Sequence, residues 1–224
     1  MTPRNGTLKF INLHTHFSLP NNELGLVNHS VLLPFAPKAD QLYSVGLHPW
    51  NLDQAKGSRW INHLEEALKH PQVLAVGECG IDRTLETSVD IQTEFFMPQL
   101  QLAEEGNKPI VLHAVRSYSD LLQLKKKTRS KIPWILHGYQ GNAETTKQLV
   151  HQGFYFSIGT TLLNDRQKLN QSLREIPLTH LFFETDESTE IVESIYIFAA
   201  RKLDLSSNEL KEQLSQNFNQ VFLK

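Results

Sequence analysis

Residues 109–137 read PIVLHAVRSYSDLLQLKKKTRSKIPWILH. The two short apolar runs, PIVLH at 109–113 and PWILH at 133–137, are typical of buried strands. Between them, residues 117–127 carry apolar side chains at helical spacing. This strand–helix–strand order is the pattern of a parallel sheet covered by helices.

The same pattern recurs along the whole chain. Six more apolar runs predict strands at 8–12, 28–33, 43–47, 73–77, 154–158 and 180–184. Helical spacing recurs at 58–69, 91–105, 143–151 and 165–174, and residues 206–223 predict a closing helix that opens with a Ser206–Glu209 capping box. We therefore predict an α/β fold, a TIM-type (β/α)8 barrel in one domain over 1–224, irregular at 34–41 after the second strand. A doubly wound open sheet is the alternative.

Composition narrows the class of protein. The 22 Lys and Arg residues nearly balance 24 Asp and Glu residues, so no general cationic field draws the protein to polyanions. The single cysteine, Cys79, excludes an internal disulfide and a zinc site built from cysteines. Neither a signal peptide nor a spanning segment is indicated. We expect a cytoplasmic protein that needs no membrane and no obligate protein partner.

Histidines and carboxylates follow the predicted strands at their carboxyl ends. A barrel gathers its active site at that end, so these side chains should converge. Imidazole and carboxylate groups together suit Zn, Mn or Mg and leave coordination positions open to water, which indicates hydrolysis. His14 and His16 could hold one ion, Glu78 could bridge two, and Asp186 is the candidate general base. The residues concerned are His14, His16, His48, Glu78, His113, His137, Glu184 and Asp186.

These residues lie in motifs that resemble the TatD family of metal-dependent deoxyribonucleases. The motifs are INLHTHF (11–17), SVGLHPW (44–50), AVGECGIDR (75–83), QTEFFMPQLQL (92–102), PIVLH (109–113), ILHGYQG (135–141), FSIG (156–159), FFETD (182–186) and SQNFNQVF (215–222). The resemblance implies a TIM barrel with two, sometimes three, divalent ions. It also implies phosphodiester hydrolysis in DNA or RNA, usually from 3′ to 5′, and we expect single-stranded DNA as the substrate.

The resemblance also assigns roles to residues. By position, His14 and His16 are similar to the ligands of the first ion and His113 and His137 to those of the second. Glu78 resembles the bridging ligand, and Asp186 the aspartate that binds metal and activates water.

The chain departs from the family pattern around these residues. Asn12 replaces an aspartate that could orient a histidine, so we expect altered metal affinity. Trp50 replaces a histidine, and Glu187-Ser188-Thr189 stands where the family has an S-P-Y-L-x-P run. We therefore expect the part of the site that contacts the substrate to differ from that of the family.

Three residues are candidate substrate contacts. His48 could contact the substrate or the leaving group, and Arg116 could clamp the scissile phosphate or form a surface ion pair. Tyr139, like Trp50, could stack on a base or roof the barrel mouth. Two other functions stay open: hydrolysis of a small ester, amide or phosphoester at the same site, or a binding or scaffolding role with a decayed site.

Overall fold

Eight parallel strands form a nearly closed barrel in the order β1 to β8. The computed structural model describes residues 8–55 and 57–223. The strands are β1 (Phe10–Thr15), β2 (Glu23–Ser30), β3 (Tyr43–Gly46), β4 (Val73–Asp82), β5 (Ile110–Val115), β6 (Trp134–Leu136), β7 (Phe154–Ile158) and β8 (Leu181–Phe183). Each strand pairs in parallel with the next, so the predicted TIM-type barrel is confirmed and the open sheet is excluded.

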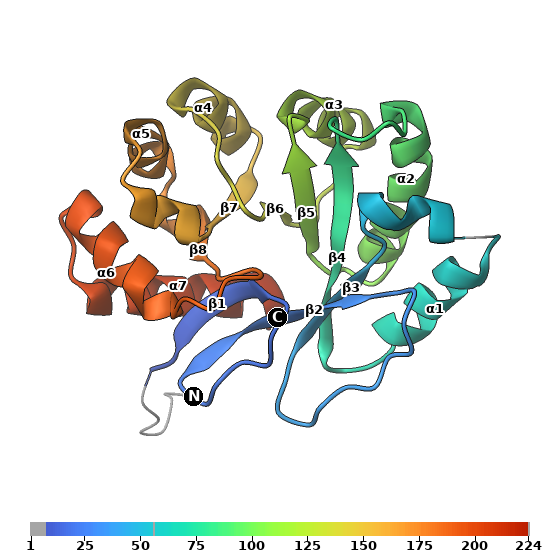
Figure 1. Cartoon of the computed structure of the whole chain (residues 1–224), viewed down its shortest axis with the longest axis horizontal. Helices are drawn as coiled ribbons and strands as arrows, with labels where there is room; N and C mark the ends of the chain where they lie inside the picture. The colour runs from blue at the N-terminus through green and yellow to red at the C-terminus, as the bar shows by residue number, and fades with distance from the viewer. Residues whose placement is uncertain (1–7, 56, 224) are drawn as a thin grey trace.

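Helices cover the outside of the barrel, from α1 and α2 on the right of Figure 1 over α3 and α4 to α5 and α6 on the left. The α-helices are α1 (Arg59–Leu68), α2 (Val89–Glu105), α3 (Tyr118–Thr128), α4 (Ala143–His151), α5 (Gln167–Glu175), α6 (Val192–Leu203) and α7 (Ser207–Phe222). Short 3-10 helices are η1 (Pro49–Gln54), η2 (Thr160–Asn164) and η3 (Leu178–His180). None of these helices within 8–55 and 57–223 is long and apolar enough to cross a membrane.

Several elements differ from the sequence prediction: β1 extends to Thr15 rather than ending at 12, and the 3-10 helices, β2, β4 and α6 also differ. Strand β2 begins at Glu23 rather than at 28, because Gly25, which has no Cβ, lets β2 lie close to the backbone of Asn12. Strand β4 continues past Gly77 to Asp82, carrying the polar residues of the site on the strand itself. Helix α6 was not predicted as a helix at all. By contrast, no helix forms at 34–41, as predicted.

The barrel closes through the segment that follows β8. The Asp186 N–H donates to the carbonyl of His14 at 3.0 Å, and the His16 N–H donates to the Asp186 carbonyl at 3.2 Å. The same contact forms a parallel bridge between Thr15 and Asp186. Closing the barrel therefore brings the side chain of Asp186 to the side chains at the end of β1.

The core lies inside the barrel and between the barrel and its helices. Large aromatic side chains fill it, and the polar atoms of Trp134, Tyr139 and Tyr196 are hydrogen-bonded. The Tyr196 hydroxyl of α6 donates to the Ile11 carbonyl at 3.0 Å and accepts from the Ile11 N–H at 3.1 Å. In α7, the Ser206–Glu209 capping box is present as predicted. Helices α6 and α7 thus pack against β1 and fix the position of the strand that carries His14.

Candidate metal centre

Glu78 reaches the interior of the barrel mouth from a bulge in β4. Val76 pairs with Ile110 and Cys79 with Leu112, so β4 carries one more residue than β5 over this stretch. Gly77, with φ of 145°, makes this possible, because a Cβ there would lie 2.6 Å from the Val111 carbonyl oxygen. The glycine before Glu78 is therefore required by the bulge that aims the carboxylate.

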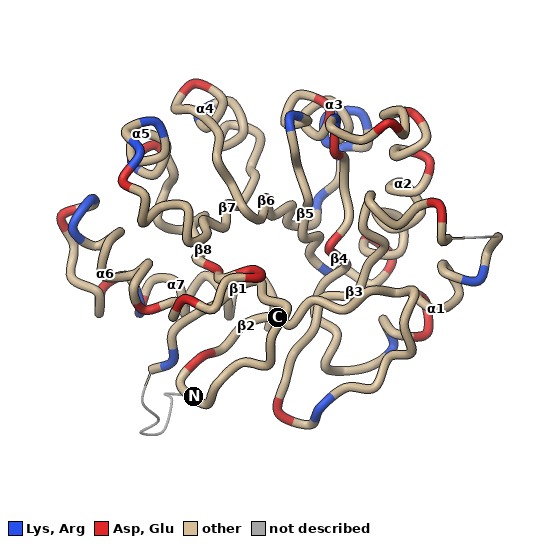
Figure 2. Tube along the Cα trace, viewed as in Figure 1, with Lys and Arg blue, Asp and Glu red and all other residues tan. Residues whose placement is uncertain are grey.

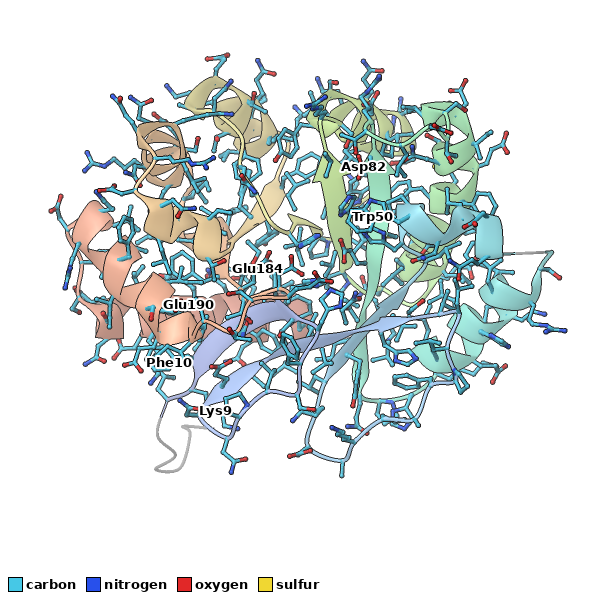
Figure 3. All side chains as sticks on the ribbon, viewed as in Figure 1. Lys9, Phe10, Trp50, Asp82, Glu184 and Glu190 are labelled. Carbon is cyan, nitrogen blue, oxygen red and sulfur yellow. The ribbon has the colours of Figure 1, made fainter. Side chains whose placement is uncertain are left out.

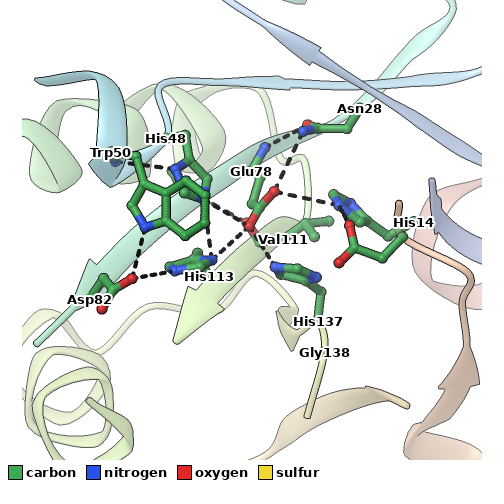
Figure 4. Close-up of polar contacts among 12 residues, drawn as sticks. His14, Asn28, His48, Trp50, Glu78, Asp82, Val111, His113, His137 and Gly138 are labelled. Atoms are coloured by element: carbon green, nitrogen blue, oxygen red, sulfur yellow. Dashed lines mark hydrogen bonds and ion pairs between the residues drawn. The ribbon is translucent and has the colours of Figure 1, made fainter. Parts of the chain in front are cut away.

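One oxygen of Glu78 faces three imidazoles. Glu78 Oε1 lies 2.6 Å from Nε2 of His137, 2.8 Å from Nδ1 of His113 and 3.1 Å from Nε2 of His48 (Figure 4). The carboxylate and two of the imidazoles are at most one-tenth exposed, and His48 is only slightly more so. Histidines from β5, from the residue after β6 and from the loop after β3 thus meet at one oxygen atom of the β4 residue Glu78.

The other oxygen of Glu78 faces the end of β1 and the barrel closure. Glu78 Oε2 lies 3.5 Å from Nε2 of His14, 4.0 Å from Nε2 of His16 and 3.5 Å from the Asn28 amide nitrogen. Oδ1 of Asp186 lies 3.5 Å from His14 Nε2 and 3.4 Å from His16 Nε2. Glu78 therefore stands between two sets of side chains, with His14, His16 and Asp186 on this side.

Two further carboxylates orient the imidazoles. Asp82 Oδ2 accepts from Nε2–H of His113 at 3.0 Å, and Glu184 Oε1 lies 3.3 Å from Nδ1 of His137. Each contact directs the other ring nitrogen of its histidine at Glu78. Sequence reasoning gave neither carboxylate this role. The spacing could have indicated these roles. Asp82 lies four residues after Glu78 and Glu184 two residues before Asp186, and residues an even number apart in an extended segment point to the same side.

The cluster is held in its ionised form by opposite charges. Burial acts to raise the pKa of Glu78, but His137 and His113 hold it well below its usual range. Burial and His137 lower the pKa of His14, but Asp186 and Glu78 outweigh them and raise it to about 9. Likewise, His14 and His16 overcome burial and keep the pKa of Asp186 well below its ordinary value. At neutral pH Glu78 and Asp186 are therefore ionised, and their negative charge favours a positive charge beside them, either an imidazolium proton or a metal ion.

The spacing of the polar atoms fits divalent ions. Among the residues that the structure describes, neither ring nitrogen of the fully buried His14 has a hydrogen-bond partner. Its Nε2 lies 3.5 Å from two carboxylate oxygens, and two ligands on one tetrahedral zinc ion lie about 3.4 Å from each other. Three groups could each hold an ion: His14, His16 and Asp186; His14, Glu78 and His137; His48, Glu78 and His113.

A cavity of about 390 Å³ opens over the cluster. Its lining includes Glu78 and Asp186 together with the exposed side chains of Leu33 and Trp50. Lys and Arg are absent from the lining that the structure describes, whereas the acidic Glu187 is part of it. Figure 2 shows Lys and Arg mainly on the outer helices and loops. A substrate therefore meets histidines, carboxylates and apolar groups at this mouth.

Comparison with known families agrees with the fold and the donor set. The family model for TatD related DNases matches residues 21–223. The chain belongs to this family. It is similar to the Bacillus subtilis metal-dependent hydrolase YabD, with 33% identity over 153 residues, 66% of this chain and 59% of that protein. It is also 30% identical, over 152 residues, to the 3′-5′ ssDNA/RNA exonuclease TatD of Citrobacter koseri, covering 64% of this chain and 56% of that protein.

Solved structures of TatD proteins share the fold. The Escherichia coli TatD homologue YjjV superposes with a TM-score of 0.79 at 21% identity, covering 97% of this chain and 99% of that chain. A TatD family hydrolase of Entamoeba histolytica gives 0.78 at 16% identity, covering 96% and 98%. At this identity the likeness concerns the fold alone. The alignments with the curated relatives named above reach only 56–59% of those relatives' length.

All six predicted metal ligands meet at the mouth of this TatD barrel, whereas two of the three predicted substrate contacts, Tyr139 and Arg116, do not line the cavity. His48 lies against Glu78 and His113, with which it could hold an ion, and it also lines the cavity, so its predicted contact with the substrate stays a prediction. Tyr139 is 0% exposed and its hydroxyl pairs with Thr146 Oγ1 at 2.8 Å, so it does not reach the cavity. Tyr139 as a substrate contact is therefore corrected.

Arg116 and Asn12 also lie apart from the ligands. Arg116 is exposed and lines a different hollow, beside Tyr118 and Thr145, so the structure does not bring it to the cavity over the cluster. The Asn12 amide donates to Glu23 and to Thr185 Oγ1, and its oxygen accepts from the Thr185 N–H. Asn12 therefore ties β1 to the segment after β8, and the altered metal affinity expected from the loss of an aspartate at this position stays a prediction.

Proposed function

We propose that the chain is a divalent-metal-dependent hydrolase that cleaves phosphodiester bonds in single-stranded nucleic acid, from the 3′ end. The observation that carries this proposal is the position of Glu78 between two sets of histidine and carboxylate ligands at the mouth of a TatD barrel. The substrate class and the polarity come from the resemblance to the TatD exonuclease of Citrobacter koseri.

In this proposal each side of Glu78 holds one ion. His14, His16 and Asp186 would hold one ion. His113, His137 and His48 would hold the other. Zn, Mn and Mg all suit these nitrogen and oxygen donors. When bound, such ions acidify water and offset the negative charge that develops on the phosphoryl oxygens. The absence of cysteine ligands leaves positions open for water and substrate.

Asp186 is the residue that accepts the proton of the attacking water. Its carboxylate is ionised at neutral pH, because His14 and His16 hold its pKa low. It is also the most exposed of the acidic ligands, with 43% of its side chain accessible at the cavity. The backbone at Asp186 is left-handed, with φ of 53°, and the carboxylate lies within 3.5 Å of both His14 and His16.

The remaining residues keep the imidazoles in their binding form. The outer ring N–H groups of His113 and His137 donate to Asp82 and Glu184, which keep their own negative charge. The inner nitrogens are then free to bind a cation beside Glu78. A binding or scaffolding protein would have no need of these buried carboxylate–histidine pairs, which favours an enzyme.

The experiment is cleavage of a 5′-labelled single-stranded oligonucleotide with added Mg, Mn or Zn, with and without chelator. We expect stepwise shortening from the 3′ end, abolished by chelator. Asp186→Asn should lower turnover at least about 100-fold without unfolding the protein, because asparagine tolerates the left-handed backbone. Hydrolysis of small phosphoesters or amides without any cleavage of DNA or RNA would overturn the nucleic-acid substrate. Full activity of Asp186→Asn would overturn the role of that residue.

A further inference from the structure

Trp50 combines an exposed ring with a fixed orientation. It begins the turn after β3 and lines the catalytic cavity, and 61% of its surface is exposed. Its indole N–H donates to Asp82 Oδ2 at 2.8 Å, the same oxygen that accepts from His113 (Figure 3 and Figure 4). The ring also makes a T-shaped contact with His48, with centroids 4.9 Å apart and planes at 83°. A large aromatic face is therefore held still beside the metal ligands and open to solvent.

The charge of the cavity makes an aromatic surface important there. Within the described lining, positively charged side chains of Lys or Arg are missing, and Glu187 adds a negative charge. The cavity thus offers no side-chain cation of that kind to a chain of phosphates beyond the ion centre itself. Leu33, 60% exposed, lines the same cavity and extends its apolar surface. Affinity for a nucleic acid at this mouth must come largely from the bases.

We propose that the exposed face of Trp50 is the stacking platform for an unpaired nucleobase of the nucleotide next to the bond that is cleaved. This inference rests on the proposed nucleic-acid hydrolysis and specifies how the substrate is held. Stacking on an aromatic ring tolerates every base, because each base has a π face. It also requires the base to be unpaired, because a base inside a duplex is covered on both faces. Trp50 thereby selects single strands without selecting their sequence.

The tryptophan itself reports on this contact. Trp60 is 7% exposed and Trp134 is 0% exposed, so Trp50 is the tryptophan that a bound base can reach. The metal-loaded protein is titrated with a short oligothymidylate whose phosphorothioate linkages slow cleavage, and binding is followed by fluorescence anisotropy of a label. We expect quenching of tryptophan emission in parallel with binding. An abasic deoxyribose-phosphate oligomer of equal length, and the Trp50→Phe variant, should show no such quenching. Binding of oligothymidylate without quenching in the wild type would overturn the inference.

Kinetics with three variants separate stacking from the hydrogen bond to Asp82. Trp50→Ala should raise KM for an ordinary oligonucleotide about 5- to 150-fold, and leave KM for a strand without bases at its 3′ end unchanged. Trp50→Phe keeps an aromatic face and loses the N–H, so it should retain the preference for bases and change mainly kcat. Leu102→Ala, a half-buried position on α2 outside the cavity lining, serves as a control for general destabilisation.

The outcomes distinguish this inference from the proposed function. If oligonucleotides are cleaved and Trp50→Ala loses equal amounts of activity on strands with and without bases, the stacking role fails and the hydrolase stands. If no strand is cleaved, the proposed function fails, and fluorescence quenching alone decides whether Trp50 binds a base. Circular dichroism of Trp50→Ala is expected to match the wild type, because the side chain is mostly exposed.

Discussion

Glu184 offers the sharpest test of how the metal centre is built. Its side chain is fully buried and its Oε1 accepts from the Gly138 N–H at 2.6 Å and faces Nδ1 of His137 at 3.3 Å. Among the described residues, its Oε2 has no hydrogen-bond partner. Glu184→Gln therefore keeps the oxygen that accepts both bonds and removes only the negative charge behind His137.

The expected effect is on metal affinity. Loss of a carboxylate that orients a metal-binding histidine costs about 10- to 100-fold in affinity, which is about 1.4 to 2.7 kcal/mol of binding free energy. The free energy of unfolding should change less than the metal affinity. Removing a buried charge is favourable, and this gain offsets the cost of burying the new amide group. Glu184→Ala is different, since the Gly138 N–H loses its partner, and it should cost about 1–3 kcal/mol of stability.

The assay is competition for Zn between metal-free protein and a coloured chelator of known affinity. Glu190→Gln is the matched control, because Glu190 lies exposed on the same loop and its removal changes net charge equally (Figure 3). We expect weaker zinc binding for Glu184→Gln than for Glu190→Gln. Equal affinities of the two variants would refute the role of Glu184 in orienting His137.

Three further predictions concern the barrel that supports the site. Gly77→Ala should lower the free energy of unfolding in urea by at least about 2 kcal/mol, which is more than the loss expected for Gly153→Ala. Both glycines have positive φ, but only a Cβ at Gly77 would meet backbone atoms. Equal losses for the two variants would contradict the bulge argument. Burial lowers the pKa of Lys125 to about 8 from 10.5, so the wild type should gain stability relative to Lys125→Met as pH rises from about 8 to 10.5. The gain is at most about 3 kcal/mol, and a flat difference in urea midpoints would disprove it. Tyr196→Phe leaves two backbone groups of β1 without partners and should lower stability by about 1–3 kcal/mol, whereas an unchanged thermal midpoint would argue against this anchor.

Most of the barrel follows from the sequence because its strands are short, apolar and separated by amphipathic helices. Strand β7 at 154–158 and helix α4 at 143–151 have the predicted bounds. Helix α6 escaped prediction because its central residues, 195–200, are almost uniformly apolar and show little helical periodicity. Strand β4 was predicted too short because its polar residues point into the barrel mouth, where apolar patterning gives no guidance.

The convergence of the six candidate ligands follows from one rule, that parallel strands present their carboxyl ends at the same face. The roles of Asp82 and Glu184 depend instead on which ring nitrogen each histidine turns toward Glu78. That choice is made by packing across the barrel. The same is true of Tyr139, whose exposure depends on a hydroxyl partner in α4, Thr146. Residue order predicts the strand end on which a side chain lies, but not its direction.

The most direct measurement is to count and locate the ions. A crystal of protein purified with Zn or Mn, measured at the absorption edge of the metal, should give two anomalous peaks per chain, one on each side of Glu78. One peak should lie near His14, His16 and Asp186, and the other near His113 and His137. A single peak, or peaks away from Glu78, would contradict a two-ion centre and the hydrolysis proposed for it.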